Sequence, residues 1–171
     1  MKESVVLVGT GSIGQAIARR VGAGKHVVLG DLKLEAAKVA AKIFSDAGFD
    51  VSAIAVDISS RESILKLVEH AQQFGAVKNL ICAAGVSPSQ APVEKILQVD
   101  LYGTAVLLEE FGKIIADGGS GVVISSQSGH RLGALTEEQN FQLATTPTEE
   151  LLNLPFLREI TDTLKAYQRA A

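Results

Sequence analysis

Up to Ser125 the chain alternates between short apolar runs and longer amphipathic stretches. The runs are rich in β-branched residues and apolar at successive positions, which is typical of strands buried on both faces of a parallel sheet. Parallel strands need crossover connections, so the alternation predicts βαβ units with helices on both faces of one sheet. Five strands are predicted, at Val5–Val8, His26–Leu29, Val51–Val56, Asn79–Ala83 and Val122–Ser125.

The stretches between these runs carry apolar residues three and four apart, the spacing of one helical face. The longest predicted helix is Val93–Ala116. Asp57-Ile58-Ser59-Ser60 supplies hydroxyl groups to cap one helix, and Gly48 ends the preceding one. Three apolar stripes stand out: Ala36, Val39, Ala40, Ile43 and Phe44; Ile64, Leu67, Val68 and Ala71; and Leu97, Leu101, Thr104, Ala105 and Leu108.

The alternation stops after Ser125. Gln127–Leu157 contains no clear strand and two short helix-prone pieces, Thr136–Leu143 and Thr148–Leu152, and a last helix is predicted over Arg158–Ala170. An irregular segment of this length is usually functional or mobile. We expect residues 1–171 to form a single domain in which 127–157 is an irregular insertion.

The composition narrows the class of protein. With 171 residues, 47% of them hydrophobic, and a net charge of −3, the chain can bury a core of its own. No run of Lys and Arg is interleaved with aromatic residues, so we expect no nucleic-acid partner. Cys82 is the only cysteine, which excludes an internal disulfide and indicates a small buried side chain in a reducing compartment.

Metal and membrane sites are not expected either. His26, His70 and His130 lack the spacing of metal ligands. The apolar run at the N-terminus ends at Gly9 and is too short for a signal segment or a membrane span. We therefore expect a cytoplasmic protein without a metal.

The first predicted strand leads directly into a glycine-rich turn that opens a helix, Gly9-Thr10-Gly11-Ser12-Ile13-Gly14. In the pattern G-x-G-x-x-G the first glycine allows the sharp turn, the second lets a pyrophosphate approach the backbone, and the third lets helix and strand pack closely. Free N–H groups at the helix N-terminus then attract the phosphate charge. The pattern predicts a dinucleotide site in a Rossmann-type fold, a doubly wound parallel sheet in three α/β/α layers.

The second predicted strand is followed by Asp31, where an acidic side chain would bind the ribose hydroxyl groups of a dinucleotide. Its carboxylate would repel a 2′-phosphate, and Lys33 is the only base nearby. This predicts NAD as the cofactor in preference to NADP. The alternative is that Asp31 caps the next helix and that the turn holds no ligand.

Four later segments place acidic, small and hydroxyl residues after strands or within the long helix. They are Val56-Asp57-Ile58, Cys82-Ala83-Ala84-Gly85, Val99-Asp100-Leu101-Tyr102-Gly103-Thr104 and Gly121-Val122-Val123-Ile124-Ser125-Ser126-Gln127-Ser128-Gly129. In this order they resemble motifs of the short-chain dehydrogenase/reductase superfamily, over nearly the whole chain. The resemblance implies an oxidoreductase that moves a hydride between a nicotinamide cofactor and a secondary alcohol or ketone.

The resemblance also implies roles for single residues. Ser126 would orient the substrate oxygen, Tyr167 would exchange its proton, and Asp57 would meet the adenine amino group. The 93–116 helix would face a partner subunit in a homo-oligomer, although core packing also explains its stripe. With the residues already named, the cofactor-binding set is Gly9, Gly11, Ser12, Ile13, Gly14, Asp31, Leu32, Asp57, Ile58, Ala83, Ala84 and Gly85.

The chain departs from the family pattern at the catalytic residues. The family has a lysine four residues after its tyrosine, and this position is Ala171. Asp100 stands where the family has an asparagine, so it either serves a water relay or pairs locally. Tyr167 follows Ser126 at an unusually long distance and could be a core tyrosine, and Ser126 could simply end its strand. Two interpretations remain: a longer reductase seen without its C-terminal part, and a shortened relative that binds the nucleotide without catalysis.

Overall fold

The computed structural model describes residues 2–130, 135–159 and 161. The chain forms two compact units. Met1–Ala84 and Val106–Ile124 make up the first unit, and Gly85–Ala105 and Ser125–Ala171 make up the second. The expectation of a single domain over 1–171 stays a prediction.

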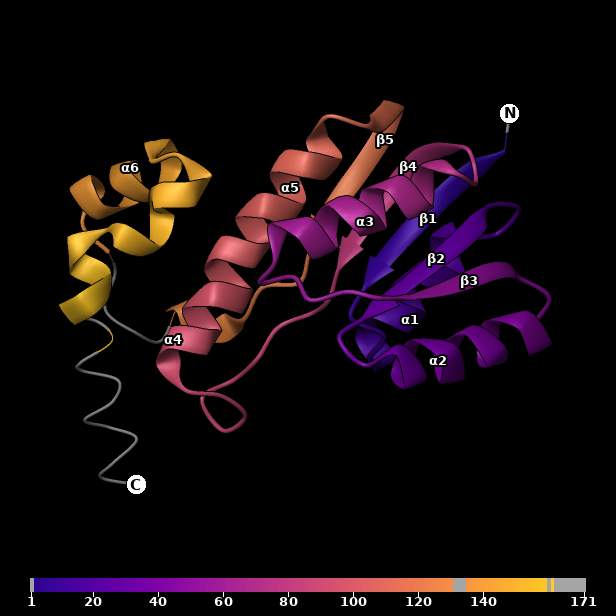
Figure 1. Ribbon diagram of the computed structural model, residues 1–171, viewed down its shortest axis with the longest axis horizontal. Coiled ribbons are helices and arrows are strands. Elements are labelled where there is room, and N and C mark those ends of the chain that lie inside the picture. Colours follow the sequence, from indigo (N-terminus) through magenta and orange to yellow (C-terminus); the bar gives the residue numbers. More distant parts are fainter. Residues whose placement is uncertain (1, 131–134, 160, 162–171) are drawn as a thin grey trace. The chain divides into compact units, whose positions relative to one another are not determined.

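The first unit contains a five-stranded parallel sheet in the order β3-β2-β1-β4-β5 (Figure 1). The predicted doubly wound sheet is therefore confirmed. The strands are β1 (Glu3–Val8), β2 (His26–Asp31), β3 (Asp50–Ala55), β4 (Ala76–Cys82) and β5 (Ile115–Val123).

Strand β5 begins earlier than predicted and ends at Val123 rather than Ser125. Its first half contains Gly118, which has a φ of +72°. Gly118 belongs to a glycine-rich run whose sequence is typical of a turn. The strand accommodates this run by a register shift: Val77 of β4 pairs with Ile115, whereas Asn79 pairs with Ser120.

Helices cover both faces of this sheet, which confirms the three layers (Figure 1). Helix α1 (Ser12–Val21) packs on β1 and β4, and α2 (Leu34–Asp46) packs on β2 and β3. Helix α3 (Arg61–Gln72) packs on β1 and β4 from the opposite face, beside residues 106–112 of α5 (Thr104–Gly112). The predicted helix ends are observed: Ser60 Oγ accepts from the Ser63 N–H at 3.3 Å, and Gly48 has a φ of +86°.

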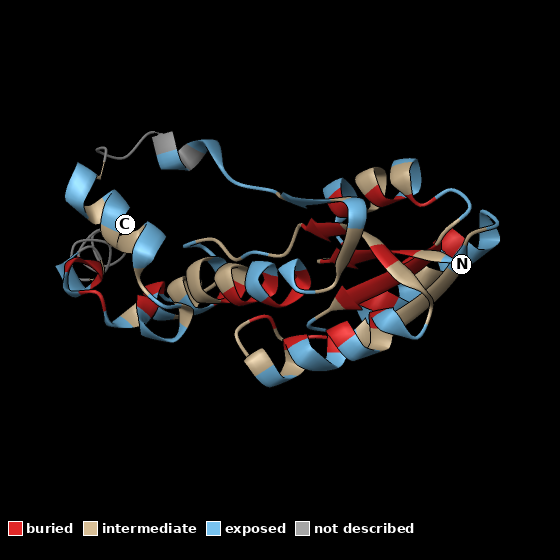
Figure 2. Cartoon of the chain, turned by 90° about the horizontal axis from the view of Figure 1, so that it is seen from above, coloured by how far each residue is buried: buried red, intermediate tan, exposed pale blue. Residues whose placement is uncertain are grey.

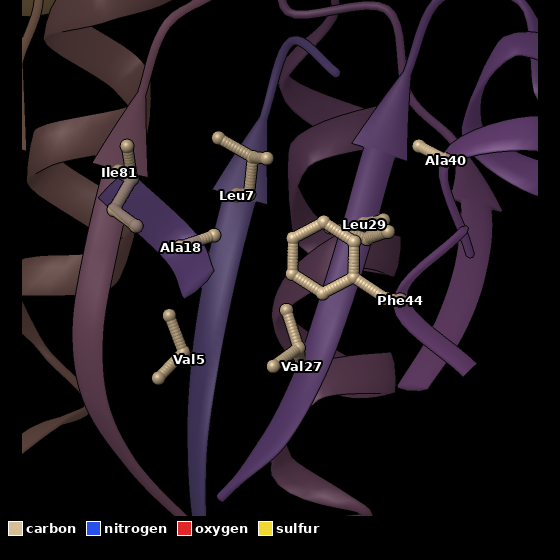
Figure 3. Packing of buried hydrophobic residues seen from close by; sticks show 8 residues of the cluster. All are labelled: Val5, Leu7, Ala18, Val27, Leu29, Ala40, Phe44 and Ile81. Atoms are coloured by element: carbon tan, nitrogen blue, oxygen red, sulfur yellow. The ribbon is translucent and has the colours of Figure 1, made fainter. Parts of the chain in front are cut away.

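The core between the sheet and helices α1 and α2 is fully apolar. Each of its side chains is at most 1% exposed, and each large one contributes roughly 1.5–3 kcal/mol on burial. Figure 2 shows buried residues concentrated in the strands of this unit. Figure 3 shows the cluster, made of Val5, Leu7, Val27, Leu29 and Ile81 from the strands, Ala18 from α1, and Ala40 and Phe44 from α2.

The stripe predicted for α2 is only partly correct. Ala40 and Phe44 are buried with Ala37, but Val39 is 63% exposed and Ile43 is 44% exposed. This helix lies over the edge of the sheet, where β3 has no further neighbour, so it buries only a narrow face. Hydropathy alone could not show that the face with Ala37 is buried and the face with Val39 is exposed.

The described part of the second unit is helical. It comprises α4 (Val93–Ile96), the π-helix η1 (Leu97–Gly103), the start of α5, the 3₁₀ turns η2 (Gln127–His130) and η3 (Thr148–Asn153), α6 (Glu137–Thr145) and a helical stretch at 155–159. The two predicted helical pieces are thus present, and Thr136 and Gln139 form a capping box at α6. Its apolar cluster contains Leu151, Leu154, Phe156 and Leu157, packed with Leu97, Leu101, Ala105, Leu135 and Leu143.

The prediction of one regular helix over Val93–Ala116 is wrong in two respects. The helix widens into a π segment at Leu97–Gly103, and it ends at Gly112, so that Ile115 and Ala116 belong to β5. Leu97, Leu101 and Ala105 of its predicted stripe pack in the second unit, whereas Leu108 is 46% exposed. None of the helices in the described part of the chain is long and apolar enough to cross a membrane.

Candidate functional site

Four strands of the first unit end together at the carboxyl edge of the sheet. The hydrogen bonds between neighbouring strands continue one residue beyond the strand ends. The Gly9 N–H donates to Gly30 O and the Ala83 N–H donates to Val8 O, both at 2.8 Å. The Val56 N–H donates to Asp31 O at 2.8 Å in the same way. The order β3-β2-β1-β4 reverses direction between β1 and β4, and such a switch point is where open parallel sheets bind ligands.

The glycine-rich turn lies directly against the end of β4. Gly9 has a φ of +89°, and a Cβ there would lie 2.4 Å from Ala84 N and 2.6 Å from the carbonyl carbon of Ala83. At Gly14 a Cβ would come within 2.6 Å of Leu7 Cδ1, so this glycine lets α1 pack closely on β1, as predicted. Among the described residues, a Cβ on Gly11 would meet nothing within 4 Å, so the turn leaves open space at this position.

The N-terminus of α1 faces this open space without a side-chain cap. Its N-cap residue is Gly11, and no acidic side chain occupies its first turn. Ser12 is exposed, and Ile13 is 59% exposed. The first-turn N–H groups are therefore available to an anion, which is the property that the glycine pattern predicts.

Asp31 follows Gly30 at the same edge, and donors on Thr10, Lys33 and the Leu32 backbone hold its carboxylate. Oδ2 accepts from Thr10 N at 2.9 Å and from Thr10 Oγ1 at 2.7 Å, and Oδ1 accepts from Lys33 N at 3.1 Å. Burial raises the pKa of Asp31, but the hydrogen bonds from Thr10 and from the backbone of Lys33 and Leu32 bring it below its usual value. The group is a carboxylate at neutral pH.

The interpretation of Asp31 as a helix cap is wrong. The N-cap residue of α2 is Lys33, and it makes no side-chain capping bond. Asp31 binds the Lys33 N–H ahead of the helix and is otherwise held by the neighbouring turn. Leu32, also predicted at the cofactor site, is 64% exposed.

Asp57 shapes the turn before α3. Its Oδ1 accepts from Ser59 N at 2.9 Å and from Ser59 Oγ at 2.6 Å, and its N–H donates to Ser63 Oγ at 2.9 Å. Ile58 is only 5% exposed, so its side chain belongs to the core. Asp57 therefore lies beyond the end of β3 in a fixed turn.

In the second unit, Asp100 lies in the π-helix and pairs locally. Its Oδ1 accepts from Val86 N at 3.0 Å, and a Cβ on Gly85 would come within 3.2 Å of the same oxygen. Partial burial of the carboxyl group raises the pKa of Asp100, and the bond from Val86 lowers it in part. The local pairing proposed from sequence is thus observed.

Of the other two predicted catalytic residues, Ser126 and Tyr167, the structure describes only Ser126. Ser126 is exposed after β5, and its carbonyl oxygen accepts from Gly129 N at 3.2 Å. Tyr167 lies outside the described residues. The catalytic roles of Ser126, Tyr167 and Asp100 stay predictions.

Sequence reasoning missed Thr10. It occupies a variable position of the glycine pattern, yet it is 7% exposed and makes both bonds to Asp31 Oδ2. The sequence signal that could have identified Thr10 is a hydroxyl residue after the strand next to the predicted ribose-binding carboxylate.

A separate cavity of about 390 Å³ lies at the amino edge of the sheet. It is lined by Lys2, Gly22, Ala23, Gly24, Lys25, Ala47, Gly48, Phe49 and Asp50.

Comparisons with known proteins agree with this arrangement. A family model described as enoyl-(acyl carrier protein) reductase matches residues 8–140. The short-chain dehydrogenase/reductase bsc3 of Alternaria brassicicola is 42% identical over 168 residues, which cover 97% of this chain and 61% of that protein. The short-chain dehydrogenase/reductase SDRA of Arabidopsis thaliana is 25% identical over 138 residues, covering 75% of this chain and 54% of that protein.

Solved structures show the same fold. A short-chain dehydrogenase/reductase from Serratia marcescens has a TM-score of 0.66 at 26% identity, covering 77% of this chain and 58% of that one. One from Burkholderia phymatum in complex with NAD has a TM-score of 0.66 at 23% identity, covering 75% of this chain and 50% of that one.

The chain spans no more than 61% of the length of these relatives. The family model covers more than half of the chain. The parallel sheet also has the fold of the solved structure from Serratia marcescens. The chain therefore belongs to the short-chain dehydrogenase/reductase family.

Proposed function

We propose that this chain binds NAD at the carboxyl edge of its sheet and serves hydride transfer between the nicotinamide and a secondary alcohol or ketone. The observation that carries the proposal is the Asp31 carboxylate. It is ionised, it is held in one orientation, and it lies beside the turn that opens α1. A carboxylate at this place suits a ribose diol and disfavours a 2′-phosphate.

The remaining residues of the edge suit other parts of a dinucleotide. The N–H groups at the start of α1 would hold the pyrophosphate over Gly11, where a Cβ would have open space around it. Asp57 would accept from the adenine amino group, and the main chain at Ala83 and Ala84 would line the path towards the nicotinamide. Gly85 would continue this lining.

For catalysis, bound NAD supplies the hydride acceptor, and the protein supplies orientation and a proton path. Ser126 would donate a hydrogen bond to the substrate oxygen, and Tyr167 would take up or return the proton of that oxygen. Asp100 would connect this path to water. We place the protein in the cytoplasm, as a homo-oligomer through its 93–116 segment.

Fluorescence titration with NADH and NADPH tests the cofactor assignment. We expect NADH to bind at least about tenfold more tightly, which corresponds to roughly 1.4 kcal/mol. Asp31→Ser should reduce this ratio towards one, because the ribose loses its acceptor and a 2′-phosphate no longer meets a negative charge.

Asp46→Ser is the matched control, since Asp46 is an exposed carboxylate of α2 whose partner is Lys42, and the change in net charge is the same. This variant should keep the ratio of the unmodified chain. Equal affinities for NADH and NADPH in the unmodified chain would contradict the role given to Asp31.

A further inference from the structure

Thr10 is a buried polar residue in a turn that otherwise consists mostly of small residues. Its side chain and its main chain both make short bonds: Oγ1 and N donate to Asp31 Oδ2 at 2.7 and 2.9 Å, and its carbonyl oxygen accepts from Gln15 Nε2 at 2.7 Å. With 7% exposure, Thr10 has little room for another side-chain orientation. The residue is thus fixed by β2 on one side and by α1 on the other.

These bonds decide what the Asp31 carboxylate can still accept. A carboxylate oxygen accepts about two hydrogen bonds, and Thr10 supplies two donors to Oδ2. Oδ1 accepts from Lys33 N at 3.1 Å, and the Leu32 backbone also bonds this carboxyl group. Because both Thr10 donors bond Oδ2, a ligand hydroxyl group would approach the carboxylate from the Oδ1 side.

The same bonds keep the carboxylate from turning away. An exposed aspartate can rotate about χ1 and χ2 at little cost, which would let it avoid the charge of a 2′-phosphate. Charge-assisted bonds to a fixed partner oppose that rotation. Discrimination between the two nucleotides then depends on Thr10 as well as on Asp31.

We propose that Thr10 is a positioning residue for cofactor selectivity, which acts by holding the Asp31 carboxylate so that Oδ1 meets the ribose diol. This inference rests on the proposed function, namely that the edge binds NAD. Thr10 does not itself touch the nucleotide in this role. Its hydroxyl group matters through the orientation and the charge of Asp31.

Thr10→Val and Thr10→Ser test the proposal. Valine has the shape of threonine without the hydroxyl donor, whereas serine retains it. We expect Thr10→Val to reduce the NADH-to-NADPH affinity ratio about tenfold, the effect of losing one charge-assisted bond. Thr10→Ser should restore the ratio, and Thr10→Val should have no further effect on the ratio in the Asp31→Ser background.

A purely structural role would give a different pattern. Both affinities would then fall together in Thr10→Val, with the ratio unchanged, and this result would overturn the proposal while leaving the assignment of NAD intact. No preference for NADH in the unmodified chain would instead overturn the proposed function, and the selectivity role of Thr10 with it.

A second readout needs no cofactor. A carboxyl ¹³C NMR titration measures the pKa of Asp31, which should rise in Thr10→Val and stay low in Thr10→Ser, because the hydroxyl bond favours the ionised form. An unchanged pKa in Thr10→Val would overturn the positioning role whether or not NAD binds. Urea unfolding of each variant checks that it is folded under the conditions of the titration.

Discussion

At the scale of single residues, the glycine-rich turn combines backbone conformation with close contact. Gly9 has a φ of +89°, and a Cβ there would overlap the main chain at Ala84 N; Gly24 has a φ of +75°, and a Cβ would meet nothing within 4 Å. We expect Gly9→Ala to lower the free energy of unfolding by about 3 kcal/mol or more, and Gly24→Ala by about 1–2 kcal/mol from φ strain alone. Urea unfolding of both variants measures the difference, and equal losses would show that the contact with β4 is not tight.

Sequence reasoning correctly predicted the positions of residues that depend on local chain geometry. Gly9, Gly14 and Asp31 follow from a fixed spacing along strand, turn and helix, and the structure places all three at the carboxyl edge. Thr10 could not be found in that way, because its role depends on a neighbour across the sheet. Asp57 was correctly placed at the end of β3, but its bonds to Ser59 required coordinates.

At the scale of elements, a chain of polar side chains joins β2, β3 and α3 near the amino edge. Ser52 Oγ lies 2.9 Å from His26 Nε2 and 3.1 Å from His70 Nε2, and His26 Nδ1 lies 3.1 Å from Asp50 Oδ1. Phe74 stacks on the His26 ring and meets the His70 ring edge-on. The Ser52 hydroxyl group therefore lies between the two imidazole rings.

This arrangement predicts how stability depends on pH. Burial lowers the pKa of His70 below its usual value near 6.5, and the charge of His26 lowers it further. The unfolded chain therefore binds more protons than the folded one below about pH 6.5, so the free energy of unfolding should fall as the pH drops from there through the folded pKa. Urea unfolding at about pH 7.5 and 5.5 should show a smaller fall in His70→Gln than in the unmodified chain; an equal fall would contradict the role of His70.

At this scale, the sequence correctly predicted the elements that are buried and apolar. Strands β1 to β4 were found because each is a run of apolar residues between turn signals. Strand β5 was misplaced because Gly118 and Gly119 sit in its first half, and the π segment at Leu97–Gly103 has no signal in hydropathy. In α2, the burial of Ala37 rather than Val39 depends on which face meets the sheet.

At the scale of the whole molecule, the proposed association of copies of the chain depends on apolar side chains exposed on the 93–116 segment. Leu108 of α5 is 46% exposed although it continues the apolar stripe of the 93–116 segment. Val39 of α2 is more exposed, at 63%, and lies on a helix of the opposite face of the sheet. The two residues therefore form a matched pair for an association test, because each substitution by glutamate adds one charge at an exposed apolar position.

We expect Leu108→Glu to weaken self-association and Val39→Glu to leave it unchanged, since a charge buried in an interface without a partner is costly. Sedimentation equilibrium at increasing protein concentration measures this. A loss of about 2 kcal/mol would raise the dissociation constant roughly thirtyfold. Equal effects of the two substitutions would place the contact elsewhere, and a monomer at every concentration would contradict association through 93–116. Because Leu108 lies on α5 and the residues proposed to bind the nucleotide lie beyond the ends of β1 to β4, NADH titration of Leu108→Glu should give the affinity of the unmodified chain. This measurement separates assembly from the proposed cofactor binding.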